Sequence, residues 1–215
     1  MNLLCRFYDV TDGEVLIDGK NVKDLDLYNL RQNIGMAMQD VFLFSDTIEG
    51  NIAYSKPDCP VQEVEKAALM ADADDFIRQM PDGYDTIVGE RGVGLSGGQK
   101  QRISLARALL KEPSILILDD TTSAVDMETE SYIQKQLSTL DRNCTIFVVA
   151  YRISSIKDSD LILVLNNGRI VEQGTHDELL KNNGYYATVF RHQYGEFEKY
   201  VDELNSSIRQ EGKGK

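Results

Sequence analysis

The sequence predicts an α/β fold with a mainly parallel sheet, and the pattern of residues 114–150 carries this prediction. Residues 114–118 and 144–150 are continuous apolar runs, which are typical of strands buried on both faces. Residues 127–140, between the two runs, have apolar side chains at helical spacing. A strand, a helix and a second strand in this order indicate a parallel βαβ unit with a right-handed crossover.

Shorter elements precede this unit. Residues 15–19 predict a strand closed by a turn, and residues 34–39 predict a second strand that ends in polar side chains. From residue 47 to 80 the apolar positions recur every three or four residues, so we expect helices there. A further helix is expected from about residue 98 to 110, and residues 1–8 resemble the last turn of a helix.

After the βαβ unit, residues 161–165 and 169–173 flank Asn-Asn-Gly, which predicts a β-hairpin. Thr175 and Glu178 have the spacing of a capping box, and Asn-Gly at residues 183–184 is expected to end the helix that follows. Residues 196–215 are charged and predict a helix that frays into a tail.

Composition and charge argue against several classes of function. The chain of 215 residues has 23 Lys and Arg against 35 Asp and Glu, for a net charge of −12, and this acidic balance argues against a nucleic-acid partner. The 3 cysteines are far apart, so neither a metal site nor a disulfide framework is predicted. No apolar run approaches the roughly 18 residues of a membrane helix, so we expect any link to a membrane to run through a partner.

The most specific element is Leu-Ser-Gly-Gly-Gln at residues 95–99. Its glycines let the backbone approach a charged group closely, and Ser96 adds a hydroxyl. The helix that begins here offers free N–H groups and the positive end of its dipole. The motif therefore predicts an anion site, with a glycine-rich helix start that binds nothing as the alternative.

Two carboxylates, Asp119 and Asp120, follow the apolar strand of residues 115–118. Ligands of α/β sheets bind at this end of the strands. One acid there can hold the Mg²⁺ of a nucleotide, and the next can orient a water molecule. The alternative is a strand that runs into an acidic turn.

In this order the motifs resemble the nucleotide-binding domain of ABC transporters, a P-loop NTPase, and in particular the exporter type. Residues 95–99 are similar to the family's signature motif, and residues 116–119 to its Walker B strand. Ser-Ala-Val-Asp at residues 123–126 resembles the D-loop, and Gln39 resembles the Q-loop glutamine. Gly-Glu-Arg-Gly at residues 89–92 resembles the motif that precedes the signature in exporters.

The resemblance implies that two such domains pair head to tail, with ATP between the Walker motifs of one and the signature of the other. The residues that would then contact the partner's ATP are Ser96, Gly97, Gly98 and Gln99.

Other residues would serve the chain's own site. Asp119 and Gln39 would hold Mg²⁺, and Gln39 would also sense the γ-phosphate. Asp120, Gln39 and Tyr151 would be catalytic, and Asp126 would report across the dimer. Glu90 would lie near the coupling helices of the transmembrane domains.

Three departures from the family pattern matter. The Gly-x-x-x-x-Gly-Lys-Ser/Thr loop that cradles the phosphates is absent; in the family it lies upstream of a segment like residues 1–8. We therefore expect the chain to be a fragment or a misassigned start of a longer protein, and to lack the N-terminal strands; a remnant of such a domain is the alternative. Asp120 stands where the family usually has glutamate, and a carboxylate drawn back by about 1 Å can cost about a hundredfold in rate.

Tyr151 replaces the switch histidine, and a tyrosine cannot become cationic.

A complete signature beside an impaired Walker side resembles the degenerate half of a heterodimeric exporter; a homodimer with slow turnover is the alternative. His176 lies in a capping-box turn and His192 in a late helix, so neither is expected to replace the switch histidine. Taken alone, the chain is expected to be inactive.

The predicted organisation is one nucleotide-binding domain over residues 1–215: an α/β core of residues 1–42 and 103–195, a helical subdomain of residues 43–102 that carries the signature, and a tail from residue 196. We expect it to power transport by ATP hydrolysis at the cytoplasmic face of a membrane. A soluble ABC-type ATPase of translation or DNA repair and a regulatory module without hydrolysis are the alternatives. The exporter-like motif at residues 89–92 disfavours the soluble ATPase.

Overall fold

The chain forms two compact units, Met1–Val149 and Ala150–Lys215, which are considered separately. The computed structural model describes residues 1–89, 92, 94–140 and 143–195. Glu90 and the expected tail of residues 196–215 lie outside the described residues. The α/β core expected over residues 1–42 and 103–195 contributes to both units.

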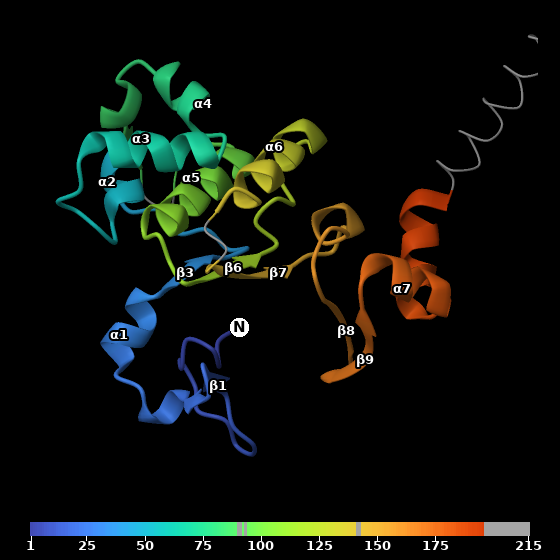
Figure 1. Cartoon of the computed structure of the whole chain (residues 1–215). Coiled ribbons are helices and arrows are strands. Elements are labelled where there is room, and N and C mark those ends of the chain that lie inside the picture. Colours follow the sequence, from blue (N-terminus) through green and yellow to red (C-terminus); the bar gives the residue numbers. More distant parts are fainter. Residues whose placement is uncertain (90–91, 93, 141–142, 196–215) are drawn as a thin grey trace, which may run out of the picture. The chain divides into compact units, whose positions relative to one another are not determined.

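A parallel sheet of three strands is the centre of the first unit (Figure 1). Its strands are β3 (Ile34–Ala37), β6 (Ile115–Asp119) and β7 (Thr145–Val149), in the order β3-β6-β7. Both strand pairs are parallel. Helix α6 (Met127–Leu137) connects β6 to β7, so the predicted βαβ unit and the α/β class are confirmed.

Strand β6 is buried on both faces, as predicted. Leu116 and Leu118 pack on one side with apolar residues of helix α5 (Gly97–Leu110). Ile117, which points to the opposite face, packs against the N-terminal segment. Its buried neighbours there are Cys5, Val22, Leu30 and Ile34.

Strand β7 differs from its prediction. We expected burial on both faces, but its central residues are only half-buried, and Thr145 and Val149 at its ends are exposed. The reason is the layer that covers it: β3, at the other edge of this sheet, is covered by helix α5 and is largely buried, whereas in the described part of the chain no helix packs as closely on β7.

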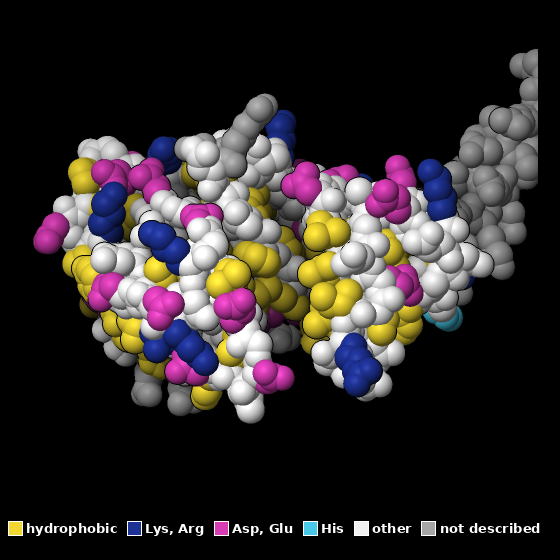
Figure 2. Space-filling model, turned by 60° about the horizontal axis from the view of Figure 1, so that its bottom comes forward, with side chains coloured by type: hydrophobic (Ala, Val, Ile, Leu, Met, Phe, Trp, Pro, Cys, Tyr) yellow, Lys and Arg dark blue, Asp and Glu magenta, His cyan; other side chains and the backbone are white. Residues whose placement is uncertain are grey.

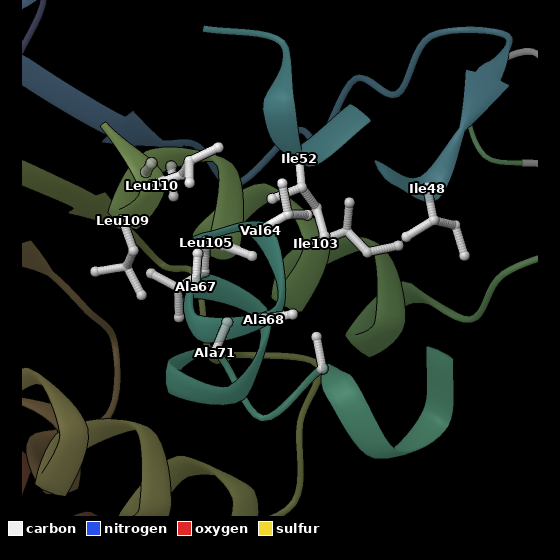
Figure 3. Packing of buried hydrophobic residues seen from close by; sticks show 14 of the residues in the cluster. Ile48, Ile52, Val64, Ala67, Ala68, Ala71, Ile103, Leu105, Leu109 and Leu110 are labelled. Carbon is white, nitrogen blue, oxygen red and sulfur yellow. The ribbon is translucent and has the colours of Figure 1, made fainter. Parts of the chain in front are cut away.

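A helical layer packs against the sheet through helix α5. Ile52, Val64 and Ile103 come from three different helices and point toward one another (Figure 3), and all three are fully buried. The helices expected over residues 47–80 are present, and most of the apolar positions behind that expectation are buried, although Val61 is 39% exposed. Besides α5, the helices of this layer are α2 (Ile48–Ala53), α3 (Val61–Met70) and α4 (Asp74–Arg78).

Small ribbons and turns complete the first unit. The remaining strands form two antiparallel pairs, β1 (Leu16–Ile17) with β2 (Lys20–Asn21) and β4 (Asp46–Thr47) with β5 (Ile87–Val88). Along the chain, β2 is followed by the 3-10 turn η1 (Val22–Asp24) and helix α1 (Leu27–Gln32), which lead to β3. A second 3-10 turn, η2 (Gly83–Asp85), precedes β5.

Residues 1–7 form turns that carry the hydrogen bonds of a helix end. The Phe7 N–H donates to the Asn2 carbonyl at 3.0 Å, and the Arg6 N–H donates to the Leu3 carbonyl at 3.2 Å. Arg6 has a φ of 48°. Together these features are those of a Schellman motif, which closes the C-terminus of many helices.

The second unit begins with the turn η4 (Ile153–Ser155), followed by strands β8 (Ile162–Asn166) and β9 (Arg169–Gly174). These strands are antiparallel, and Asn167 and Gly168 between them both have positive φ, as in a type I′ turn. Helix α7 (His176–Asn182) begins with the capping box of Thr175 and Glu178. The predicted hairpin and capping box are thus confirmed. A last helix begins at residue 185, and its described part runs to residue 195.

The surface is charged and mixed. On the face shown in Figure 2, Lys and Arg side chains lie among Asp and Glu side chains rather than in one group. Within the described ranges, every helix is too short or too polar to cross a membrane.

Candidate functional site

The glycine-rich motif forms the N-terminus of helix α5. The Ser96 Oγ accepts a hydrogen bond from the Gln99 N–H at 3.2 Å, and the Gln99 Oε1 accepts one from the Ser96 N–H at 2.9 Å. This reciprocal pair is a capping box. Gln99 is therefore committed to the helix, whereas the Ser96 hydroxyl keeps its proton for another acceptor. Ser96 and Gly97 are exposed, so the N–H groups of this first turn can meet a ligand from outside the unit.

The two glycines of the motif have different surroundings. A Cβ at Gly98 would lie 2.8 Å from the Ala124 carbonyl oxygen, which is too close for a carbon atom. A Cβ at Gly97 would meet only the Ala124 Cβ at 3.6 Å, an ordinary contact. Gly98 therefore allows the start of α5 to lie directly on the loop of residues 121–126.

The carboxyl ends of β3 and β6 bring three predicted residues together. Asp119 is the last residue of β6, and Asp120 follows it with a φ of 49° and 8% exposure. Aspartate accepts this left-handed conformation more readily than most residues. The Gln39 Nε2, just beyond β3, donates to the Asp120 Oδ2 at 3.4 Å.

Gln101, on helix α5, is a residue of this region that the sequence analysis missed. Its Nε2 donates to the Asp120 carbonyl at 3.4 Å and to the Ser123 Oγ at 3.2 Å, and its Oε1 accepts from the Ala124 N–H at 3.1 Å. The side chain is 7% exposed. It holds the loop after β6 against the helix that carries the glycine-rich motif. A glutamine among the apolar positions of a helix was the signal that could have identified it.

Asp126 is the N-cap of helix α6. Its Oδ1 accepts from the N–H groups of Glu128 at 3.0 Å and Thr129 at 2.9 Å. The pKa of Asp126 is lowered, first by the Thr129 N–H and then by the Thr129 hydroxyl. The Thr129 Oγ1 also lies 3.1 Å from the Asp72 Oδ2, and the Arg102 Nη1 lies 2.9 Å from the same oxygen. Helix α6 is thereby tied to α5 through side chains that the sequence analysis did not select.

Tyr151 belongs to the second unit, whereas Gln39, Asp119 and Asp120 belong to the first. Its side chain is 74% exposed, and its carbonyl accepts from the Gln193 Nε2 at 2.7 Å. His176 has a structural role, since its Nδ1 lies 2.8 Å from the Tyr186 hydroxyl.

A metal ion at the carboxyl ends of β3 and β6 would need further ligands from a bound nucleotide. In the described part of the chain, no three His, Cys, Asp or Glu side chains form a group able to hold a metal ion. Mg²⁺ characteristically takes one or two carboxylates together with substrate phosphates, and the Asp119 carboxylate, with the Gln39 amide oxygen, fits that pattern. A cavity of ≈ 600 Å³ at the opposite ends of β6 and β7, lined by Ser114 and Cys144 among others, includes none of the predicted residues.

Comparisons with known proteins give the same family as the sequence motifs do. The family model for ABC transporters matches residues 1–123. The ABC transporter ATP-binding protein YknU of Bacillus subtilis is 56% identical over 192 residues, which are 89% of this chain and 33% of that protein. The putative multidrug export ATP-binding/permease protein YgaD of the same organism is 53% identical over 190 residues, which are 88% and 33% of the two chains.

Among solved structures, a bacterial Atm1-family ABC exporter with ATP bound matches with a TM-score of 0.87 and 46% identity, over 89% of this chain and 34% of that one. The expected P-loop NTPase fold of ABC ATPases is thereby confirmed. The chain spans about one third of the length of the relatives that it matches.

Proposed function

Because this chain belongs to the ABC transporter family, we propose that it is the part of an ABC exporter that binds and hydrolyses Mg-ATP. The observation that carries the proposal is the contact between the Gln39 amide and the Asp120 carboxylate at the ends of β3 and β6. A family match gives only the class of protein, whereas this contact joins the amide that we propose as a metal ligand to a carboxylate, at the edge where α/β sheets bind ligands.

Each side chain of this cluster has a distinct chemical task in the proposal. Asp119, at the end of β6, supplies a carboxylate oxygen to Mg²⁺, which neutralises phosphate charge when it is bound. Gln39 directs an amide hydrogen to Asp120, so its carbonyl oxygen remains for the metal. Asp120 accepts a hydrogen bond from the attacking water and orients it toward the γ-phosphate.

The glycine-rich helix start is proposed to act on the ATP of a second nucleotide-binding domain. The exposure of this helix start supports an action on a partner's ATP, since Ser96 and Gly97 present the N-terminus of α5 to the outside of the unit. We propose a head-to-tail pair, with Gly98 and Gln99 shaping this surface and Asp126 close to the partner. Such a pair would work beneath transmembrane domains at the cytoplasmic face of a membrane, with Glu90 near their coupling helices.

The impaired side of the site supports a heterodimer. Asp120 has one methylene fewer than glutamate, and Tyr151 cannot carry the positive charge of an imidazolium. Ser96, Gly97 and Gly98, by contrast, form a complete capped helix start. We propose that the signature of this chain completes the competent ATP site of a partner. We also propose that the chain is one domain, composed of an α/β core and a helical subdomain.

The test uses the complete transporter, purified with its membrane domains in lipid vesicles. With the partner's own catalytic carboxylate disabled, Asp119→Asn should shift the Mg²⁺ concentration that supports half-maximal ATPase activity upward, because the amide no longer offers a charged ligand. The neighbouring change Asp126→Asn, which keeps the helix cap, should leave that Mg²⁺ requirement unchanged. If the unaltered transporter shows no ATPase activity at any Mg²⁺ concentration, the proposal is contradicted. It is also contradicted if the protein that contains this chain purifies without a membrane domain.

A second measurement concerns the chain by itself. Because the phosphate-cradling loop is absent from it, calorimetry with Mg-ATP should detect weak binding or none. Micromolar affinity would contradict the account of the site.

A further inference from the structure

In the second unit, the last helix holds the loop that contains Tyr151. The Gln193 Nε2 donates to the Tyr151 carbonyl at 2.7 Å, and the Gln193 Oε1 accepts from the Ile153 N–H at 3.0 Å. The next residue, Tyr194, accepts from the Ser154 N–H through its hydroxyl at 3.1 Å. Two successive side chains, about 40 residues later in the sequence, thus bind three backbone groups of one loop.

These bonds replace a local cap. Ile153 is the first residue of the turn η4, and the first N–H groups of such a turn point away from its own hydrogen bonds. The N-cap residue, Arg152, makes no side-chain cap bond. Gln193 and Tyr194 instead accept from the N–H groups at the start of this turn.

Glutamine is suited to this position because its planar amide carries a donor and an acceptor side by side. Gln193 uses both, one on each side of Arg152. The loop is anchored further by the Ile153 side chain, which is 3% exposed and packs with Leu179 and Tyr186. The Tyr151 side chain is largely exposed, so the backbone of this loop decides where its ring can reach.

We propose that Gln193 is a positioning residue, which sets the place of Tyr151 by holding the backbone on both sides of Arg152. The inference rests on the proposed function, in which Tyr151 takes the place of the switch residue at the γ-phosphate. It extends the site to a helix that carries none of the family motifs found in the sequence.

The test is a double-mutant cycle in the complete transporter with the partner's own catalytic carboxylate disabled, so that kcat/KM reports the site of this chain. Gln193→Leu keeps the size of the side chain and removes both hydrogen bonds. We expect kcat/KM for Mg-ATP to fall by about fivefold, since small displacements of a reacting group can cost up to about a hundredfold. In a Tyr151→Ala background the same change should have no further effect, because the side chain through which Gln193 acts is gone.

Two further variants sharpen the result. Gln193→Glu keeps the acceptor for the Ile153 N–H but loses the donor to the Tyr151 carbonyl, so its effect on kcat/KM should be clear but not greater than that of Gln193→Leu. Arg191→Leu is the matched control, because Arg191 is an exposed residue of the same helix that binds Asn183 and Thr188, outside the loop. It should leave kcat/KM unchanged.

Hydrogen exchange provides a readout that does not depend on catalysis. In Gln193→Leu the amides of Ile153 and Ser154 should exchange faster, while those of strand β8 should not. An equal loss of kcat/KM with and without Tyr151, or unchanged exchange at Ile153, overturns the inference. If Tyr151→Ala itself leaves kcat/KM unchanged, the proposed role of Tyr151 is wrong, and exchange at Ile153 alone then decides whether Gln193 holds the loop.

Discussion

The start of helix α5 and the end of strand β6 carry the two halves of the candidate site, and they are built differently. At the helix start, Ser96 and Gln99 are three positions apart and satisfy each other. At the strand end, Gln39 reaches Asp120 from 81 positions away. The half proposed to serve a partner's ATP thus depends on local contacts, and the half proposed to serve the chain's own ATP depends on the packing of the sheet. Substitutions should therefore separate function from stability in the first half more easily than in the second.

The largest effect is expected for Ser96→Asp. Aspartate caps a helix as well as serine does, so the free energy of unfolding should change by no more than about 0.5 kcal/mol. The added negative charge would face the partner's phosphates, and ATPase activity of the assembled transporter should fall by about a hundredfold or more.

Ser96→Ala is the matched control for this change. It should lower the stability of the chain by about 1 kcal/mol, through the lost cap, but reduce activity less than Ser96→Asp does. Full activity of Ser96→Asp would mean that this helix start does not meet ATP.

The next effect concerns the half of the site that we propose to be impaired. Asp120→Glu alone should raise hydrolysis only modestly, because Tyr151 still leaves the γ-phosphate without a histidine. Combined with Tyr151→His, the gain should exceed the product of the single gains, since residues that act as one catalytic unit are not additive. The measurement is steady-state ATPase in the full-length dimer with the partner's own catalytic carboxylate disabled. A double variant that stays at the background rate refutes the assignment of these two positions.

A smaller effect separates the two glycines of the signature. Gly98→Ala should destabilise the chain by about 1–3 kcal/mol, because its Cβ would clash with the Ala124 carbonyl. Gly97→Ala should be neutral or stabilise by up to about 1 kcal/mol, since alanine favours the helix and meets no close atom. Urea unfolding followed by circular dichroism compares the two. Equal losses of stability would show that α5 is not packed on the loop of residues 121–126 in this way.

The smallest effect is the acid sensitivity of the α6 cap. The lowered pKa of Asp126, caused first by the Thr129 N–H, means that its carboxylate stabilises the fold at pH values above the unfolded pKa of about 3.9. That contribution is lost as the pH falls through the lower, folded pKa. Asp126→Asn keeps the cap without the titration, so its stability should depend less on pH below about pH 4. Parallel pH profiles for the two proteins would contradict this account.

The sequence by itself determined the features that rest on neighbours along the chain. The capping boxes at Ser96 and Thr175 and the hairpin turn at Asn167 all need only residues within a few positions of each other. The same holds for β6, whose continuous apolar run indicates burial on both faces wherever its partners come from. The α/β class followed from the order of β6, α6 and β7 along the chain.

Only the tertiary structure decided the rest. The apolar run of β7 is like that of β6, yet β7 is only half-buried, because no helix among the described residues packs on it as closely as α5 packs on β3. The bonds of Gln101 to the loop after β6 and of Gln193 to the loop after β7 also depend on which elements pack together. A glutamine in a helix has the same local pattern whether its amide faces water or a distant loop. The physical reason is that spacing along the chain specifies local hydrogen bonds, while the partner of a long-range bond exists only once the elements have packed.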